Sequence, residues 1–352
     1  MEEAVDFIKN INEKTMIIFD NDGDGIGSAA IFAKTFKTIF GKYPEFALKT
    51  DDYSFISEKI FRKRKKLDFI VTMDIPFDEK PEYILKFAKK SKVLIIDHHQ
   101  VHENMNRYTN IVHINPEFFK TEIPSYKYCV SKLVYDIISK ICNIESLDWL
   151  AGIGILNDKC EDVWKEFMEN IYKKYNITQA ELKIVNDIIT SGYHYSGLKG
   201  ASKGYEACLE AKSPRDILES KTINSKRLKK FYDAIEKEIN NILLSWRKKA
   251  EIFNDKKLII LKINSKFLLN SPISTSISME KPDYTVVVAG KRGNAMHISL
   301  RRQDKKINCG KLAADATNNL KNAKGGGHVP AAGASIMSKD WEIFRKRVLE
   351  ML

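Results

Sequence analysis

Three carboxylates stand at every second position directly after a short apolar run, in the segment TMIIFDNDGDG. Asp20, Asp22 and Asp24 would repel one another, and burying such charges without compensation is strongly unfavourable. A calcium loop of the EF-hand type is excluded, because its twelfth position would be Ile31 rather than a bidentate Glu. Helix capping explains one or two of these aspartates but not all three. The spacing therefore predicts a bound cation that neutralises them.

The same event, an acidic residue at the end of an apolar run, recurs twice further along the chain. DFIVTMD ends in Asp74, and KVLIIDHH ends in Asp97, His98 and His99. Because the carboxyl ends of the strands in an open parallel sheet line one crevice, these side chains should converge. Several carboxylates with one or two imidazoles suit Mn²⁺ or Mg²⁺ better than metals that prefer thiolates. Two divalent ions would offset most of the charge.

The elements that must position these residues follow an α/β order in the first part of the chain. Apolar runs at 15–19, 67–73 and 92–97 alternate with helical patterns at 26–40 and 82–90. This alternation predicts a parallel sheet with helices on both faces, and continuous apolar runs suit strands that are covered on both sides. Beyond residue 126 the pattern becomes helical.

A long helix and a smaller α/β domain are expected in the rest of the chain. Residues 225–252 contain no Gly or Pro and keep apolar residues three and four positions apart, which predicts one helix that connects two lobes. Strand-like runs follow at 256–263, 284–290 and 295–302, and then come a helix over 309–323 and a loop over 325–333. We therefore expect a metal-binding domain over 1–200, a helical connector over 201–252 and a second domain over 253–352.

The charge is divided unevenly along the chain. Residues 1–200 carry 28 Lys and Arg against 30 Asp and Glu, a net −2, whereas residues 201–352 carry 30 against 16, a net +14. Either a solvated lysine-rich surface or a lobe that binds polyanions would account for this excess.

Composition and missing motifs exclude several classes. At 352 residues, 43% of them hydrophobic, the chain is long enough for two folded domains. No run of about 18 apolar residues is present, and the acidic N-terminus lacks signal-peptide order, so we expect a cytoplasmic protein without membrane association. Five scattered cysteines without a CxxC pair predict reduced thiols. No GxSxG elbow and no GxxxxGK[ST] loop is present, which argues against a serine hydrolase of that type and a nucleotide-driven motor.

Taken together, these motifs resemble the DHH phosphoesterases, a family named for the triplet that stands here as Asp97-His98-His99. The ordered match consists of DNDGDG at 20–25, Asp74, DHH at 97–99, NP at 115–116, GIGILND ending in Asp158, and GGGH at 325–328. The last motif resembles the DHHA1-type substrate-binding domain that accompanies the DHH domain in RecJ-type exonucleases, nanoRNases and cyclic-dinucleotide phosphodiesterases.

The resemblance implies roles for individual residues. The implied metal ligands, for two cations with Mn²⁺ preferred and Mg²⁺ as the alternative, are Asp22, Asp24, Asp74, His98 and Asp158, with Asp74 bridging. Asp20 is implied as a further ligand, at a position where many members have His. Asp97 and His99 are implied as catalytic residues: Asp97 orients the histidines and His99 lies next to the ligands or faces the phosphate. The implied substrate-binding residues are Arg301, Gly325, Gly326, Gly327 and His328.

The implied activity is hydrolysis of phosphodiesters by two-metal activation of water. The pattern is similar to that of archaeal RecJ-like exonucleases, which act on single-stranded DNA or RNA, and a cleft between two lobes would admit one strand. Replication or repair proteins are the further partners that this implies. Two alternatives stay open: a nanoRNase or cyclic-dinucleotide phosphodiesterase that acts on very short substrates, and a replication-complex scaffold that lost its metal site. The complete ligand set argues against the scaffold.

Overall fold

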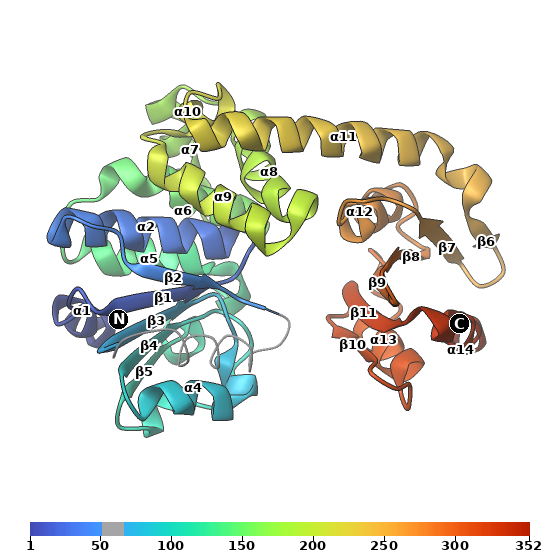
Figure 1. Ribbon diagram of the computed structural model, residues 1–352, viewed down its shortest axis with the longest axis horizontal. Coiled ribbons are helices and arrows are strands. Elements are labelled where there is room, and N and C mark those ends of the chain that lie inside the picture. The colour runs from blue at the N-terminus through green and yellow to red at the C-terminus, as the bar shows by residue number, and fades with distance from the viewer. Residues whose placement is uncertain (51–66) are drawn as a thin grey trace. The chain divides into compact units, whose positions relative to one another are not determined.

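The computed structural model describes residues 1–50 and 67–352. These residues form two compact units, Met1–Tyr232 and Asp233–Leu352, and each unit has its own sheet (Figure 1).

The first unit is organised around a five-stranded, wholly parallel sheet with the strand order β2-β1-β3-β4-β5. Its strands are β1 (Thr15–Phe19), β2 (Glu45–Leu48), β3 (Phe69–Met73), β4 (Lys92–Ile96) and β5 (Ile111–Ile114). Every residue of β1 and β3 is buried, as expected for strands covered on both faces. The expected parallel sheet is confirmed, whereas the four-residue strands β2 and β5 are not predicted from the sequence.

Helices cover both faces of this sheet. Ile17 and Phe19 of β1 pack into a core with α1, α2 and α5, while Met16 and Ile18 point to the other face, against α4 (Figure 1). Side chains alternate between faces along a strand, so one short apolar run supplies two cores. The helices of the first unit are α1 (Glu2–Lys9), α2 (Gly23–Phe40), α4 (Pro81–Ala88), α5 (Val130–Ser139), α6 (Asp148–Asn157), α7 (Lys165–Tyr175), α8 (Gln179–Ser196), α9 (Leu198–Glu210) and α10 (Pro214–Leu218).

Helix α11 (Ile223–Lys249) runs from the first unit into the second and corresponds to the long helix predicted over 225–252.

The second unit contains a six-stranded mixed sheet with the order β10-β11-β9-β8-β7-β6, in which only the β7 and β8 pair is parallel. Its remaining elements are β6 (Glu251–Phe253), β7 (Leu258–Ile263), α12 (Asn270–Glu280), β8 (Thr285–Arg292), β9 (Ala295–Arg301), α13 (Cys309–Thr317), β10 (Lys324–Gly327), β11 (Ala331–Met337) and α14 (Trp341–Met351). The expected smaller α/β domain is confirmed.

Two expectations for the second unit are wrong in detail. The glycines of GGGH were expected in a loop, but Gly325, Gly326 and Gly327 lie in β10, which pairs antiparallel with β11. Glycine disfavours strands on its own, so the pairing partner rather than local preference makes this strand. The helix expected over 309–323 ends at Thr317.

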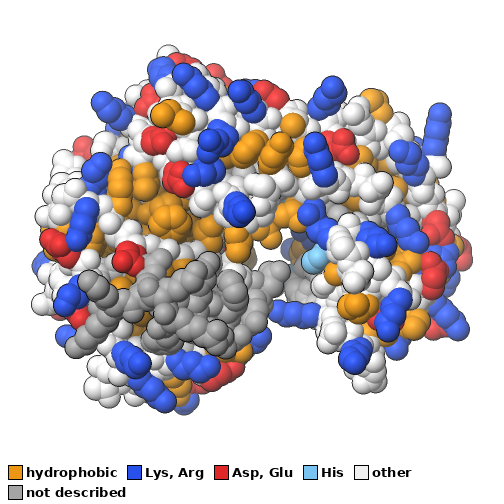
Figure 2. All heavy atoms as spheres, in the orientation of Figure 1, with side chains coloured by type: hydrophobic (Ala, Val, Ile, Leu, Met, Phe, Trp, Pro, Cys, Tyr) orange, Lys and Arg blue, Asp and Glu red, His pale blue; other side chains and the backbone are white. Residues whose placement is uncertain are grey.

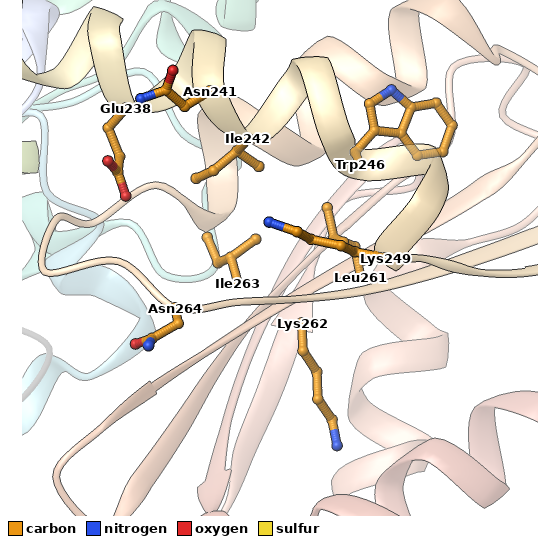
Figure 3. A pocket seen from close by; sticks show the side chains of 9 residues that line it. All are labelled: Glu238, Asn241, Ile242, Trp246, Lys249, Leu261, Lys262, Ile263 and Asn264. Carbon is orange, nitrogen blue, oxygen red and sulfur yellow. The ribbon is translucent and has the colours of Figure 1, made fainter.

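A cavity of about 270 Å³ lies in the second unit between the C-terminal part of α11 and β7 (Figure 3). Its wall includes Ile242 and Trp246 of the helix and Ile263 of the strand, and Lys249 extends between them. None of the predicted site residues lines it.

Lys and Arg side chains are spread over the face seen in Figure 2 rather than gathered in one patch. Among the described residues, no helix is both long enough and apolar enough to cross a membrane.

Candidate metal centre

The strand ends place the predicted residues at one edge of the first sheet. Asp74 directly follows β3 and Asp97 directly follows β4, and both extend the ladder. The Asp74 N–H donates to the Ile96 carbonyl at 3.0 Å, and the Asp97 N–H donates to the Ile114 carbonyl at 3.0 Å. Asp74 has φ 62°, a left-handed conformation that costs a non-glycine residue about 1–3 kcal/mol. Strain of this kind is typical of functional sites.

Asp22 and Asp24 are both held by backbone N–H groups. Asp22 caps α2, and its Oδ1 accepts hydrogen bonds from the N–H groups of Asp24 at 3.1 Å and Gly25 at 3.0 Å. Asp24 is fully buried and accepts from the N–H groups of Val130 at 2.7 Å and Ser131 at 2.8 Å. These are the first two amides of α5, which has no side-chain cap of its own. Asp24 is therefore the negative group that this helix N-terminus favours.

Two groups of three side chains could each hold a metal ion, and His98 belongs to both. Asp74, His98 and His99 form one group, and Asp24, His98 and Asp158 form the other, with ligand atoms within 4.8 Å of one another. The Nε2 atom of His98 lies 3.7 Å from Asp74 Oδ1 and 3.5 Å from Asp158 Oδ2. Residues from two strand ends, one helix start and one helix end thus converge.

One unsatisfied polar atom of the described residues at this convergence, Asp158 Oδ2, fits a cation, whereas Nδ1 of His98 is not the ring nitrogen that faces the carboxylates. Within residues 1–50 and 67–352, the buried atoms Asp158 Oδ2 and His98 Nδ1 have no hydrogen-bond partner. A buried atom without a partner is costly unless something outside the protein satisfies it. Carboxylate oxygens and imidazole nitrogens are the donors that Mn²⁺ and Mg²⁺ sites in proteins use. The donor set therefore fits divalent cations.

The electrostatics of the carboxylates also indicate that positive charge is needed here. Burial, followed by the charges of Asp22, Asp24 and Asp158, raises the pKa of Asp74 well above its usual range. Burial, followed by the charges of Asp24 and Asp22, does the same to the pKa of Asp158. Burial lowers the pKa of His98, which opposes a positive charge on this imidazole. The protein alone therefore leaves the carboxylates uncompensated, and a divalent cation would reverse this balance.

Asp97 and His99 of the DHH triplet are joined by two hydrogen bonds. The Nδ1 atom of His99 lies 2.8 Å from Asp97 Oδ1, and the His99 N–H donates to Asp97 Oδ2 at 3.0 Å. Burial opposes the charges of both residues, but their hydrogen bond and mutual attraction outweigh it, which lowers the pKa of Asp97 and raises that of His99. Asn115, from the NP pair, donates to the His99 carbonyl at 2.9 Å. The structure thus places Asp97 where it orients His99.

Asp20 has a different environment from the other aspartates. Its Oδ2 lies 2.7 Å from Lys49 Nζ, and it belongs to neither of the two three-residue groups. Lys49 directly follows β2, a strand that is not predicted from the sequence, so nothing in the sequence pairs it with Asp20. The Lys49 ammonium group therefore neutralises part of the negative charge of the three aspartates, which their spacing in the sequence attributes wholly to a bound cation.

Glycines of the motifs make room for the ligands. A Cβ on Gly154, in GIGILND, would lie 2.2 Å from Asp24 Oδ1 and 2.0 Å from Ser131 Oγ. A Cβ on Gly25 would lie 2.5 Å from the Asp20 carbonyl. Gly154 therefore lies where α2, α5 and α6 meet around a buried carboxylate, and Gly25 lies where the first turn of α2 packs against the backbone of Asp20.

Asn157 is a residue at the centre that sequence reasoning missed. It ends α6, and its side-chain amide donates to Asp22 Oδ2 and to Asp158 Oδ1, each at 3.0 Å. Its position directly before Asp158 was the one available signal, but an Asn-Asp pair at a helix end usually indicates a solvated turn.

In the second unit, the three glycines of GGGH differ in their surroundings. A Cβ on Gly325 would lie 2.3 Å from the Ala313 carbonyl, and Gly327 has φ 141° with the Ala331 carbonyl 2.6 Å from its Cβ position. A Cβ on Gly326 would meet no atom within 4 Å. Gly326 and Gly333 pair in register across β10 and β11. The protein's own packing therefore accounts for two of the three glycines and leaves Gly326 facing open space.

The neighbouring predicted residues have contrasting partners. Arg302 is buried and pairs with Asp304 at 2.8 Å, whereas Arg301 donates to Ser271 Oγ and to the Leu300 carbonyl, each at 2.9 Å. Among the residues that the structure describes, no carboxylate pairs with Arg301. His328 is exposed at the turn after β10, where its N–H donates to the Ala331 carbonyl at 2.8 Å.

Comparison with known proteins identifies two families of domain. A model described as the DHH family, N-terminal domain, matches residues 14–155, and a model described as the DHHA1 domain matches residues 269–352. A comparison with curated proteins gives no match.

Solved structures share the fold at low sequence identity. The chain is similar to RecJ in complex with Mn²⁺ from Thermus thermophilus, with a TM-score of 0.71, 15% identity, and coverage of 98% of this chain and 53% of that one. It is also similar to the pGpG-specific phosphodiesterase PggH from Vibrio cholerae, with a TM-score of 0.54, 13% identity, and coverage of 96% and 98%. CDC45 from Entamoeba histolytica gives a TM-score of 0.57, 11% identity, and coverage of 99% and 97%. The chain thus spans about half of the Thermus RecJ.

The order of the motifs, the parallel sheet that presents them and both matching domain models agree. The chain therefore contains a DHH N-terminal domain over residues 14–155, followed by a DHHA1 domain over residues 269–352.

Proposed function

We propose that this protein is a metal-dependent phosphodiesterase, and in particular a RecJ-like exonuclease that hydrolyses single-stranded DNA or RNA. The observation that carries the proposal is the pair of ligand groups that share His98, with buried carboxylates that no cation of the described chain neutralises. The similarity in fold to RecJ and to PggH supports phosphodiester chemistry.

Two divalent cations, Mn²⁺ in preference to Mg²⁺, would be held by the predicted ligands Asp22, Asp24, Asp74, His98 and Asp158. In this proposal Asp74, which belongs to the first ligand group, bridges the two cations. Asp20 is proposed as a further ligand. When bound, the cations supply an acidified water and positive charge at the attacked phosphate. Thermus RecJ was solved with Mn²⁺, which supports this choice.

Asp97 and His99 are the catalytic pair in this proposal. The hydrogen bond to Asp97 keeps a proton on Nδ1 of His99 and fixes the plane of the ring. In the imidazolium form, which the raised pKa of His99 favours, Nε2 also carries a proton and can donate to a phosphate oxygen. His99 is half-buried, so a substrate can reach it.

The second unit would bind the substrate strand. Gly326 leaves room for a phosphate to approach the backbone of β10 closely. Two side chains would donate hydrogen bonds to that phosphate: His328, which directly follows β10, and Arg301, which pairs in register with Ala331 of β11. Arg301 has no acidic partner among the described residues, as expected for a side chain that binds an anion. The net +14 of residues 201–352 supports a polymeric rather than a small substrate. Replication or repair proteins as partners, and a cytoplasmic location, remain predictions.

A phosphodiesterase of dinucleotides is the second candidate. The similarity to PggH, which covers 98% of that chain, favours it, and it would use the same metal ligands. The scaffold alternative has less support, since a protein without catalysis has no need for strained Asp74 or for uncompensated carboxylates.

One experiment tests the proposal and separates the two candidates. End-labelled single strands of two to about 20 nucleotides are incubated with protein after chelation and after addition of Mn²⁺, at several salt concentrations. We expect no cleavage after chelation, recovery with Mn²⁺, and an affinity for long strands that falls steeply with salt because several phosphates are neutralised. Faster cleavage of dinucleotides than of every longer strand, together with salt-independent binding, would favour the dinucleotide phosphodiesterase. Full activity after exhaustive chelation would contradict both.

A further inference from the structure

Asn157 connects two candidate metal ligands that come from different elements. Asp22 precedes the first turn of α2, and Asp158 follows the last turn of α6. One amide group, Nδ2 of Asn157, donates to Asp22 Oδ2 and to Asp158 Oδ1, each at 3.0 Å. The carbonyl oxygen of the same side chain accepts from the Gly23 N–H at 3.1 Å.

These three hydrogen bonds determine which way the amide points. An asparagine side chain has two N–H donors and one carbonyl acceptor, and here both donors face carboxylates while the acceptor faces a helix N-terminus. The reverse orientation would direct the Oδ1 lone pairs at two carboxylates and the NH₂ group at the Gly23 N–H. Each of these contacts would be repulsive. Asn157 therefore has a single favourable arrangement.

The arrangement selects which oxygen of Asp158 remains available, and it fixes the orientation of the Asp22 carboxylate. Oδ1 of Asp158 accepts a hydrogen bond from Asn157. Oδ2 of Asp158 has no hydrogen-bond partner among the described residues and lies 3.5 Å from His98 Nε2. Asp22 has Oδ1 fixed by α2 amides and Oδ2 fixed by Asn157. Because outer partners of this kind orient metal ligands, their loss typically weakens metal binding by about 10–100-fold.

We propose that Asn157 is a positioning residue of the metal centre, which sets the orientation of Asp22 and Asp158 toward a divalent cation. The inference rests on the proposed function, because it requires that a cation binds between these carboxylates. It goes beyond the predicted ligand set, since Asn157 itself does not need to touch the metal or the substrate.

The packing around Gly23 shows that the space at this point is fully used. A Cβ on Gly23 would lie 2.9 Å from Asn157 Oδ1 and 2.2 Å from Asn186 Oδ1. Asn186 belongs to α8 and is buried, and its Oδ1 has no partner within the described parts of the chain. Asn186 thus offers a matched control: it is a second amide beside Gly23, but no hydrogen bond joins it to a candidate ligand.

The test measures Mn²⁺ affinity and turnover in the full-length protein. Asn157→Ala, Asn157→Ser and Asn186→Ala are compared with the wild type by titration with Mn²⁺, followed by the electron paramagnetic resonance of the free ion, and by cleavage of an end-labelled strand. We expect Asn157→Ala to weaken at least one Mn²⁺ site by about 10-fold or more. Turnover should recover to within a few-fold of wild type at saturating Mn²⁺. Asn157→Ser should show a smaller shift in the same direction, and Asn186→Ala should bind Mn²⁺ as the wild type does.

The outcomes separate this inference from the proposed function. If the wild type binds no Mn²⁺, the proposed function fails, whatever the variants do. If the wild type binds Mn²⁺ and both Asn157 variants bind it with the same affinity, Asn157 is not a positioning residue, even where their melting temperatures fall. Should Asn157→Ala fail to fold, as judged by circular dichroism, the Asn157→Ser titration decides the question in the same way.

Discussion

Glycines lie next to the predicted functional residues in both units, but Gly326 of the second unit has different surroundings from Gly25 and Gly154 of the first. In the first unit, the space beside Gly154 is filled by the carboxylate of Asp24, and the space beside Gly25 is filled by the backbone of Asp20. In the second unit, no atom lies within 4 Å of the Cβ position of Gly326. The chain's own atoms therefore fill the space beside the glycines of the first centre, whereas the space beside Gly326 is open, as the proposed binding of a substrate strand requires.

We expect the largest effect from substitutions that remove a candidate metal ligand of the first unit. Asp74→Ala or His98→Ala should lower turnover by at least about 10³-fold, because each residue belongs to a ligand group and no neighbour replaces it. The fold of Asp74→Ala should persist, since removing one of several repelling carboxylates relieves the metal-free protein. Cleavage assays and circular dichroism check both statements.

Asp20→Ala is the control for these ligand variants. Asp20 pairs with Lys49 and lies outside both ligand groups, so its loss should reduce turnover less than the loss of Asp74. Near-normal turnover of Asp74→Ala would remove this residue from the centre.

A pair of glycine variants tests the comparison itself. Gly154→Ala should displace the Asp24 carboxylate, which would weaken Mn²⁺ binding by about 100-fold and lower the melting temperature. Gly326→Ala should leave the melting temperature within about 1 °C of wild type but weaken single-strand binding by about 10-fold, because a methyl group enters the open space.

Gly325→Ala is the matched control within the same strand, since its Cβ would meet the Ala313 carbonyl and should destabilise the second unit. The contrast between the two units would be lost if Gly326→Ala bound strands as the wild type does. It would also be lost if Gly154→Ala kept full Mn²⁺ affinity.

The smallest expected effect concerns pH in the metal-free protein. The pKa values of Asp74 and Asp158 are raised in the folded state, so the folded protein binds more protons than the unfolded chain once the pH exceeds the ordinary aspartate pKa. The contribution of Asp74 and Asp158 to the stability of the metal-free protein should therefore be greatest at acid pH and should be lost as the pH rises through their raised pKa values. Asp97 and His98, whose pKa values are lowered, contribute in the opposite direction. Thermal melts at several pH values after chelation measure this, and saturating Mn²⁺ should remove the decline. A contribution of Asp74 and Asp158 that grows over this rise would contradict the assigned directions.

Local patterns and long-range contacts differ in how well the sequence predicts them. Asp74 and Asp97 are predictable because each directly follows a short apolar run, and His98 because it follows Asp97; the parallel sheet then brings the strand ends together. Asn157 and Lys49 are not, because their importance depends on partners 135 and 29 positions away. The strand β10 is not predicted for the same reason, since a run of glycines favours a loop until β11 pairs with it.

The bonds that hold Asp24 also bear on how the first unit folds. The hydrogen bond from Val130 to Asp24 closes a loop of 106 residues, and the bond from Asn157 to Asp22 closes one of 135. Contacts of such high sequence separation form late, because closing a long loop costs conformational entropy before the contact itself stabilises the chain. During synthesis, the first aspartates are made long before the residues that orient them. We therefore expect cations to enter a first unit that is already folded, in contrast to small zinc domains, in which the metal itself drives folding.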